Sequence, residues 1–254
     1  MKLSQVALQL YTLREFLKTP EDIRSTLQRV VEIGYPAVQV SGTGPIPEED
    51  LVAICHDLGL TICATHEPSQ FIRETPEAAV ERLQKLGCAL SAYPFPAEVD
   101  MGDLASVDAM IADLDRAAAV FEQAGMRLTY HNHAIEFCRA EGQTILERIY
   151  ARSRIQGEPD VHWIQRGGGD SVAWCHKLKG RLPIIHLKDF RMTPKNEPEF
   201  AEIGHGNMDM PAICRAAEEA GCEWFAVEQD VCPGDPFESV KMSFDYIKAN
   251  LATA

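Results

Sequence analysis

The sequence predicts an α/β protein folded as a single (β/α)8 TIM barrel, and three observations support this fold class. Eight short runs rich in β-branched and aromatic residues recur along the chain, separated by segments with helix signals. The runs start on average about 31 residues apart, which leaves room for one strand and one crossover helix in each unit. The 254 residues match eight such units with little left over, so we expect one domain spanning residues 1–254.

The strands and helices are expected to alternate along the whole chain. Strands are expected at residues 6–11, 37–40, 61–65, 88–93, 127–131, 159–163, 183–187 and 224–228. The clearest helix start is Thr19, where a capping residue precedes Pro20 and two acids, and this helix is expected to stop at Gly34. Further helices are expected over residues 47–58, 75–86 and 106–124, and after Asp209 and Asp235.

An open, doubly wound sheet is the alternative architecture. It normally uses fewer strands and carries a glycine-rich phosphate turn after the first strand, where this chain reads YTLRE. Neither a G-x-G-x-x-G nor a P-loop pattern occurs in the sequence. The run from Gly167 to Gly169 is interpreted as a flexible loop that follows a strand.

Composition and charge narrow the class of protein. The chain has 24 Lys+Arg against 38 Asp+Glu, a formal charge of −14, which disfavours a general nucleic-acid binder. Its eight cysteines form no C-x-x-C pair and lie in apolar stretches, as reduced thiols do. The first residues lack the apolar run of a signal peptide, and no run is long enough to span a membrane. We therefore expect a cytoplasmic enzyme with no membrane partner.

Histidines and acids gather at the ends of the predicted strands, where a TIM barrel carries its chemistry. Five of the eight histidines fall there: His66, His131, His133, His162 and His186. The acids that join them are Glu67, Glu136, Asp160, Asp189, Glu228 and Asp230. Each alone is equally well explained as a hydrogen-bonded core histidine or a helix-capping acid, but together they exceed random scatter.

Four consecutive strands each contribute a possible metal ligand. Residues two apart on a strand point to the same face, which pairs His131 with His133, Asp160 with His162, His186 with Lys188, and Glu228 with Asp230. One imidazole or carboxylate from each strand gives a nitrogen and oxygen cluster suited to Mn²⁺, Mg²⁺, Zn²⁺ or Co²⁺. The predicted ligands are His131, Asp160, His186 and Glu228.

Several of these stretches together resemble the xylose isomerase-like TIM barrel superfamily, and most of all its sugar phosphate isomerase/epimerase branch with its inosose dehydratase-like members. They are, in order, QLYTLRE, YHNHAIEF, DVHWIQRGGGD, IIHLKDF, EIGHGNMDMPAI and VEQD. The resemblance runs from about Val6 to Leu251. It implies one divalent ion bound by a Glu, an Asp, a His and a Glu on strands five to eight, and Asp160, His186 and Glu228 match the last three.

Strand five departs from the pattern of these relatives. His131 stands where many of them carry the glutamate, as in members with an H-N-H signature. Glu136, in the loop that follows, is predicted as a possible substitute carboxylate. Gln39 occupies the strand-two position where relatives often carry a Glu.

The resemblance implies chemistry through an enediolate, in which two metal-bound glutamates exchange the proton α to a carbonyl. Replacing one glutamate by His131 favours a one-sided step, in which a base removes the α proton and a β-hydroxyl or glycosidic oxygen leaves with help from an acid. We therefore predict a lyase or dehydratase acting on a keto-sugar or keto-inositol, with isomerisation or epimerisation as the close alternative. His131, Glu136, Glu228 and Lys188 are the predicted catalytic residues.

Other residues are predicted to contact the substrate, each with a structural role as the competing interpretation. They are His66, Glu67, His133, His162, Trp163, Arg191 (for a phosphate or carboxylate) and Tyr11. Two other functional classes stay open at this point. An abasic-site endonuclease would need more zinc ligands and a basic surface, and a non-catalytic sugar-binding barrel would bind no metal. A homo-oligomer is possible, as for many soluble enzymes.

Overall fold

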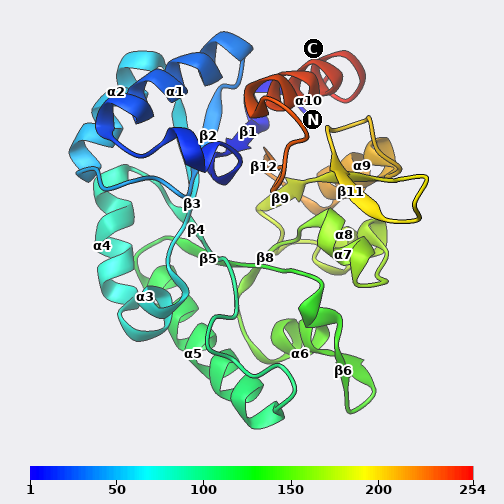
Figure 1. Cartoon of the computed structure of the whole chain (residues 1–254). Coiled ribbons are helices and arrows are strands. Elements are labelled where there is room, and N and C mark those ends of the chain that lie inside the picture. Colours follow the sequence, from blue (N-terminus) through cyan, green and yellow to red (C-terminus); the bar gives the residue numbers. More distant parts are fainter. Residues whose placement is uncertain (254) are drawn as a thin grey trace.

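The computed structural model describes residues 1–253 as an eight-stranded parallel sheet rolled into a barrel, with an outer ring of helices (Figure 1). The strands lie in the order β8-β5-β4-β3-β2-β1-β12-β9. Their bounds are β1 Val6–Gln9, β2 Ala37–Val40, β3 Thr61–His66, β4 Leu90–Tyr93, β5 Arg127–His131, β8 Gln156–Glu158, β9 Ile184–Leu187 and β12 Trp224–Val227. The predicted TIM barrel is confirmed.

The barrel closes between β8 and β9 through isolated contacts instead of a continuous ladder. Asp160 and His186 form a parallel bridge, in which the backbone N–H of His186 donates to the carbonyl of Pro159 at 3.0 Å. Closer to the amino ends of these segments, Gly157 N–H donates to the carbonyl of Arg181 at 2.7 Å. The last seam of the barrel therefore joins two residues that the sequence predicts as metal ligands.

Most helices begin and end where the sequence signals indicate. The Thr19 side chain accepts from the backbone N–H of Asp22, and the Asp22 carboxylate accepts in return from the N–H of Thr19, a capping box. Gly34 and Gly59 end the first two long helices with φ of 120° and 70°, a region that favours glycine. The helices of eight or more residues are α1 Pro20–Ile33, α2 Glu48–Leu58, α4 Pro76–Leu86, α5 Leu104–Gln123, α6 Ile145–Arg152, α9 Met210–Ala220 and α10 Pro236–Asn250.

Short elements fill the loops between these units. They are η1 Leu3–Gln5, η2 Leu10–Phe16, η3 Ile135–Phe137, α3 Ser69–Glu74, α7 Val161–Arg166, α8 Ser171–Lys177, and the hairpins β6 Arg139–Ala140 with β7 Gln143–Thr144 and β10 Asp189–Met192 with β11 Pro198–Ala201. Of the helices within residues 1–253, none is both long and apolar enough to cross a membrane. All eight cysteines are free, and six of them are buried.

Strand six is displaced from its predicted position. The sequence predicts a strand over residues 159–163, but the strand is β8, Gln156–Glu158, and helix α7 begins at Val161. The reason is local: Pro159 has no N–H for a ladder, and the Asp160 side chain accepts from the N–H of Trp163 as a helix cap. The run from Gly167 to Gly169 therefore follows a helix and not a strand.

The barrel interior changes from small apolar residues to polar residues along the strand direction. Its apolar layer contains Ala7, Ala37, Cys63, Ala64, Leu90, Ile184 and Ala226. Side chains two positions later share the same interior face, so Ala37 is followed by Gln39, Ile184 by His186 and Ala226 by Glu228. This step places the polar layer at the carboxyl ends of the strands, where the loops can enclose it.

Candidate active site

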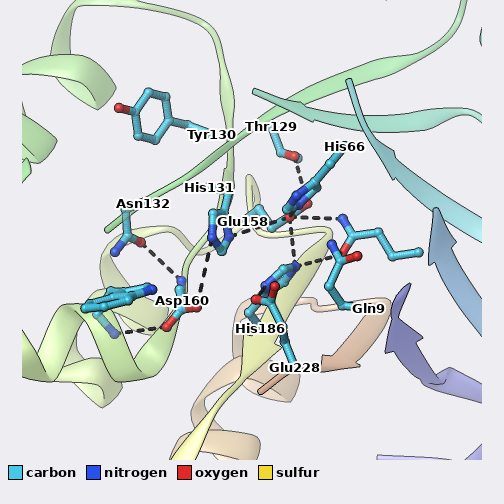
Figure 2. A network of polar contacts seen from close by, with 12 residues as sticks. Gln9, His66, Thr129, Tyr130, His131, Asn132, Glu158, Asp160, His186 and Glu228 are labelled. Atoms are coloured by element: carbon cyan, nitrogen blue, oxygen red, sulfur yellow. Dashed lines mark hydrogen bonds and ion pairs between the residues drawn. The ribbon is translucent and has the colours of Figure 1, made fainter. Parts of the chain in front are cut away.

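Four donor groups converge at the carboxyl ends of β5, β8, β9 and β12 (Figure 2). His131 ends β5, Asp160 follows β8, His186 lies in β9, and Glu228 follows β12; we call these residues the outer quartet. All four are buried, and one ligand atom from each lies within 4.8 Å of the others. His131 Nε2 is 4.0 Å from Asp160 Oδ2, and His186 Nδ1 is 2.9 Å from Glu228 Oε2. The predicted ligand residues are thus brought together.

The outer quartet contains the donor types that bind divalent cations. Imidazole nitrogens and carboxylate oxygens in a mixed set suit Zn²⁺, Mn²⁺ or Co²⁺, and the carboxylates also suit Mg²⁺. His131 Nδ1 and Asp160 Oδ2 are buried without a hydrogen-bond partner, although Asp160 Oδ2 lies in an ion pair. The residues present therefore fit a metal centre.

Lys188 places a buried ammonium group against the acids of this cluster. Its Nζ lies 2.9 Å from Asp160 Oδ2, 2.8 Å from Glu228 Oε2 and 3.0 Å from Asp230 Oδ2. Burial alone would lower the pKa of Lys188, but the three carboxylates raise it above its ordinary value. Burial raises the pKa of Asp160 to about 6 despite Lys188, whereas Lys188 and His186 overcome burial and lower the pKa of Glu228.

Glu158 forms the centre of a second polar layer that the sequence analysis missed. Its Oε1 atom lies 2.6 Å from His66 Nε2 and 2.9 Å from His186 Nε2 (Figure 2). The same atom accepts from Gln39 Nε2 at 3.0 Å. Burial would raise the pKa of Glu158, but the charges of His66 and His186 lower it to about 2. Conversely, Glu158 and Glu228 outweigh burial and raise the pKa of His186 to about 10.

A cavity of about 430 Å³ opens above the outer quartet. Its floor includes His131 and Glu228, and its lining contains three aromatic side chains, those of Tyr11, Phe95 and Trp163. The remaining lining residues are Ser41, His66, Glu67, Pro68, Pro94, His133 and Asp230. No lysine or arginine belongs to this lining as far as residues 1–253 are concerned. The cavity therefore combines possible metal ligands with aromatic side chains in its lining.

Most predicted substrate-contacting residues reach this cavity. Tyr11, His66, Glu67, His133 and Trp163 all line it. The ring of His133 lies 4.9 Å from that of His131 (centroid to centroid), as expected for residues two apart. Glu67 is also held by a short ion pair with Arg82 of α4, so one of its functions is structural.

Glu136 does not reach the cavity, so the structure does not support its predicted catalytic role. Its side chain is fully buried, and its two oxygens accept from the Tyr130 hydroxyl at 2.9 Å and from the backbone N–H of His133 at 2.7 Å. Burial raises the pKa of Glu136 to about 7. These contacts hold the loop after β5, and thereby the position of His133.

His162 and Arg191 are also placed away from the cavity. Because α7 replaces the predicted strand, His162 packs in an aromatic cluster, with its ring 4.7 Å from that of Phe200. Arg191 lies on the exposed hairpin strand β10 and pairs with Glu199 at 2.6 Å. Neither residue is positioned to contact a ligand in the cavity.

Two residues of this site, Glu158 and Phe95, were not predicted from the sequence. Glu158 lies two positions before Asp160, and the same two-residue rule that pairs His131 with His133 could have identified it. Phe95 follows β4 and is exposed over 47% of its surface, a signal visible only in the folded chain.

The barrel is that of a known family of proteins. Residues 27–249 match a model of the xylose isomerase-like TIM barrel family, and the chain belongs to this family. It is 26% identical over 166 residues to an inosose dehydratase of Geobacillus kaustophilus, an alignment that covers 55% of this chain and 51% of that protein. The chain thus spans about half the length of this curated relative.

Two solved structures share the fold over nearly the whole chain. A sugar phosphate isomerase/epimerase from Parabacteroides distasonis has a TM-score of 0.80 and 23% identity, covering 98% of this chain and 95% of that one. A xylose isomerase-like TIM barrel protein from Mycobacterium smegmatis, solved in complex with magnesium, has a TM-score of 0.73 and 12% identity, covering 97% of each chain. At these identities the likeness establishes the fold.

Proposed function

We propose that this protein is a divalent-metal-dependent enzyme that removes the proton α to the carbonyl of a keto-sugar or keto-inositol. The observation that carries the proposal is the outer quartet at the floor of a cavity whose lining includes aromatic side chains. Membership of a family with isomerase, epimerase and dehydratase relatives is consistent with this chemistry. A lyase or dehydratase step is favoured, with isomerisation or epimerisation as the alternative.

His131, Asp160, His186 and Glu228 would hold the metal. A divalent ion bound there supplies Lewis acidity, which stabilises negative charge on an enediolate oxygen. Lys188 keeps Asp160 and Glu228 ionised by its ammonium charge, so both carboxylates are available as ligands.

His133 is the residue best placed to accept or return the proton. It lines the cavity beside the outer quartet, with its ring 4.9 Å from that of His131. Burial, helped by the charge of Lys188, lowers the pKa of His133 to about 4, so the ring is neutral at physiological pH and has a free lone pair. We therefore assign proton transfer to His133, which the sequence predicted as a substrate contact, and not to Glu136, which the sequence predicted as a catalytic residue.

The presence of only one glutamate in the outer quartet favours elimination over epimerisation. An epimerase needs proton carriers on both faces of the substrate, whereas the outer quartet contains a single glutamate, Glu228, with His131 in the place of the second. Glu228 is in addition paired with Lys188 at 2.8 Å. A leaving hydroxyl or glycosidic oxygen would depart toward the Asp230 side of the cavity and take up the proton that His133 has removed.

The cavity favours a neutral substrate. Its lining offers no lysine or arginine to bind a phosphate. Its volume lies in the range of small-molecule sites, and Tyr11, Phe95 and Trp163 offer a surface for the apolar face of a sugar ring. Unphosphorylated keto-sugars, inososes and 3-keto-glycosides are therefore the substrates to test.

Proton exchange in D₂O, followed by NMR with Mn²⁺, Co²⁺ or Mg²⁺ present, tests this function. The wild-type protein should exchange one α proton of its substrate. His133→Gln should slow exchange by about 10²–10⁴-fold, and Arg191→Ala should leave it unchanged. Full exchange by His133→Gln would refute the role of His133. Absence of exchange and of product for every keto-sugar and metal would refute the proposed function.

A further inference from the structure

A second set of four donors lies directly below the outer quartet. His66, His131, Glu158 and His186, here called the inner quartet, also place one ligand atom each within 4.8 Å of the others. Three imidazole nitrogens and one carboxylate oxygen form a set typical of zinc sites. We propose that the inner quartet is a second cation position, selective for Zn²⁺ or Co²⁺ and separate from the outer quartet.

The distances around Glu158 are those of a site that can close on a small cation. Its Oε1 atom lies 2.6 Å from His66 Nε2, 2.9 Å from His186 Nε2 and 3.8 Å from His131 Nδ1. A tetrahedral centre with bonds of about 2.0–2.1 Å places its ligand atoms roughly 3.3 Å apart. The observed values lie on both sides of this spacing, so small side-chain shifts would complete the coordination.

The acids of the two quartets also differ in their charged partners. Asp160 and Glu228 of the outer quartet already face the ammonium group of Lys188. Glu158 is fully buried, and within residues 1–253 it forms ion pairs only with histidines. A buried carboxylate is costly without a compensating charge. In the metal-free protein the imidazoles provide this charge, and a divalent ion bound by the same rings in their neutral form would take their place.

An unsatisfied atom points into the inner quartet. His131 Nδ1 is buried and has no hydrogen-bond partner, and the nearest acidic oxygen is Glu158 Oε1 at 3.8 Å. Buried polar atoms are rarely left without a partner. A cation bound to Glu158 would provide one for this nitrogen.

The carboxylate of Glu158 is held in position by hydrogen bonds from neighbouring strands. Gln39 Nε2 donates to Oε1 at 3.0 Å and Thr129 Oγ1 donates to Oε2 at 3.1 Å, while Gln9 Nε2 donates to Gln39 Oε1 at 2.9 Å. Hydrogen bonds of this kind orient metal ligands in proteins. The inner quartet therefore has its own supporting layer, made by β1, β2 and β5.

The two positions are coupled because they share two rings through opposite nitrogens. His186 presents Nδ1 to Glu228 and Nε2 to Glu158, and His131 presents Nε2 to Asp160 and Nδ1 to Glu158. A neutral imidazole has one lone pair. A cation in the inner quartet therefore competes with a cation in the outer quartet, and Zn²⁺ should antagonise Mg²⁺ or Mn²⁺.

Co²⁺ titration of the metal-free full chain, followed by its visible absorption, tests the proposal. Glu158→Gln and His66→Gln remove ligands that belong to the inner quartet alone, and each should weaken Co²⁺ binding roughly 100-fold or more. Asp160→Asn, which alters only the outer quartet, should bind Co²⁺ within about threefold of wild type. Glu136→Gln is the matched control, since it neutralises another fully buried glutamate outside both quartets.

Wild-type Co²⁺ affinity in both Glu158→Gln and His66→Gln would overturn the proposal. So would an equal loss in Asp160→Asn, because the ion would then lie in the outer quartet. If Glu158→Gln fails to fold, judged by circular dichroism, the partly exposed His66 still decides between the outcomes. This measurement needs no substrate, so its failure is distinguishable from a failure of the proposed enzymatic function.

Discussion

Asp160 and Glu158 lie two residues apart at the end of the same strand, and both side chains are completely buried, yet their surroundings differ. Asp160 faces one ammonium group, Lys188, and the competing carboxylate of Glu228; its pKa is raised to about 6, chiefly by burial. Glu158 faces the imidazoles of His66 and His186, and its pKa is lowered to about 2 in spite of burial. Since burial is the same, the neighbouring charges account for the difference between the two pKa values.

Glu136 extends this comparison to a buried carboxyl group without any cation. Its two oxygens accept hydrogen bonds from a tyrosine hydroxyl and a backbone N–H, and burial raises its pKa to about 7. The three acids thus form a series in which compensation by positive charge increases from Glu136 to Asp160 to Glu158. Each step of the series can be altered by mutation.

The largest effect is expected from Lys188→Met, which removes the ammonium group that faces the acids of the outer quartet. Asp160, Glu228 and Asp230 would be left with uncompensated charge, which should lower the free energy of unfolding by about 3–5 kcal/mol. Urea unfolding without divalent metal measures this. In the control Lys177→Met, an exposed pair with Glu147 is lost, and the change should stay below about 1 kcal/mol. A Lys188→Met protein as stable as wild type would contradict the account.

Glu136→Gln should change how stability depends on pH. The pKa of Glu136 is about 7 in the folded state against about 4.5 when unfolded, so between these values the folded state holds a proton that the unfolded state has lost. Its contribution to stability is therefore fully present below pH 4.5 and is lost as pH rises through 7, on the order of 3 kcal/mol in total. Gln cannot ionise, so wild type should lose stability relative to Glu136→Gln between pH 5 and 8. A difference that does not vary with pH would refute the raised pKa.

Gln39→Leu tests the layer that supports Glu158. The variant loses the hydrogen bonds to Glu158 and His186, at 3.0 and 2.7 Å, and should lose about 1–3 kcal/mol of stability. Co²⁺ affinity should fall about 10–100-fold, because the ligands are no longer oriented. Gln28→Ala removes an exposed side-chain pair on α1 and serves as the control. Unchanged Co²⁺ affinity in Gln39→Leu would show that Gln39 does not orient the ligands.

The smallest effect is expected from Arg191→Ala. Its partner Glu199 is about as exposed as Arg191 itself, and such surface pairs contribute about 0–1 kcal/mol. The KM for a keto-sugar should not change. An increase of tenfold or more would place Arg191 at the substrate and restore the anion-binding role predicted from the sequence.

The sequence predicted that the four side chains of the outer quartet lie close together, because strand alternation and barrel geometry are regular. His131, His186 and Glu228 lie at the ends of apolar strands, so their faces followed directly from the period of two. Glu158 was missed because β8 is only three residues long, contains Gly157 and is followed by Pro159, while the β-branched and aromatic residues beyond it form α7. Side-chain capping by Asp160 outweighed local β-propensity there.

The roles of Glu136 and Lys188 depended on details that a pattern does not contain. Glu136 turns to the backbone N–H of His133, and this choice depends on the short η3 turn after β5. Lys188 was correctly placed beside His186 by alternation, but its three carboxylate partners come from two other segments of the chain. Such convergence appears only once the barrel has closed.

The central claim is that this polar floor is a divalent metal centre, and anomalous X-ray diffraction from crystals soaked in Mn²⁺, and separately in Zn²⁺, tests it most directly. We predict a Mn²⁺ peak within bonding distance of Asp160 and Glu228, and a Zn²⁺ peak beside Glu158 and His66. The absence of any anomalous peak among these residues, with both ions in excess, would contradict the account.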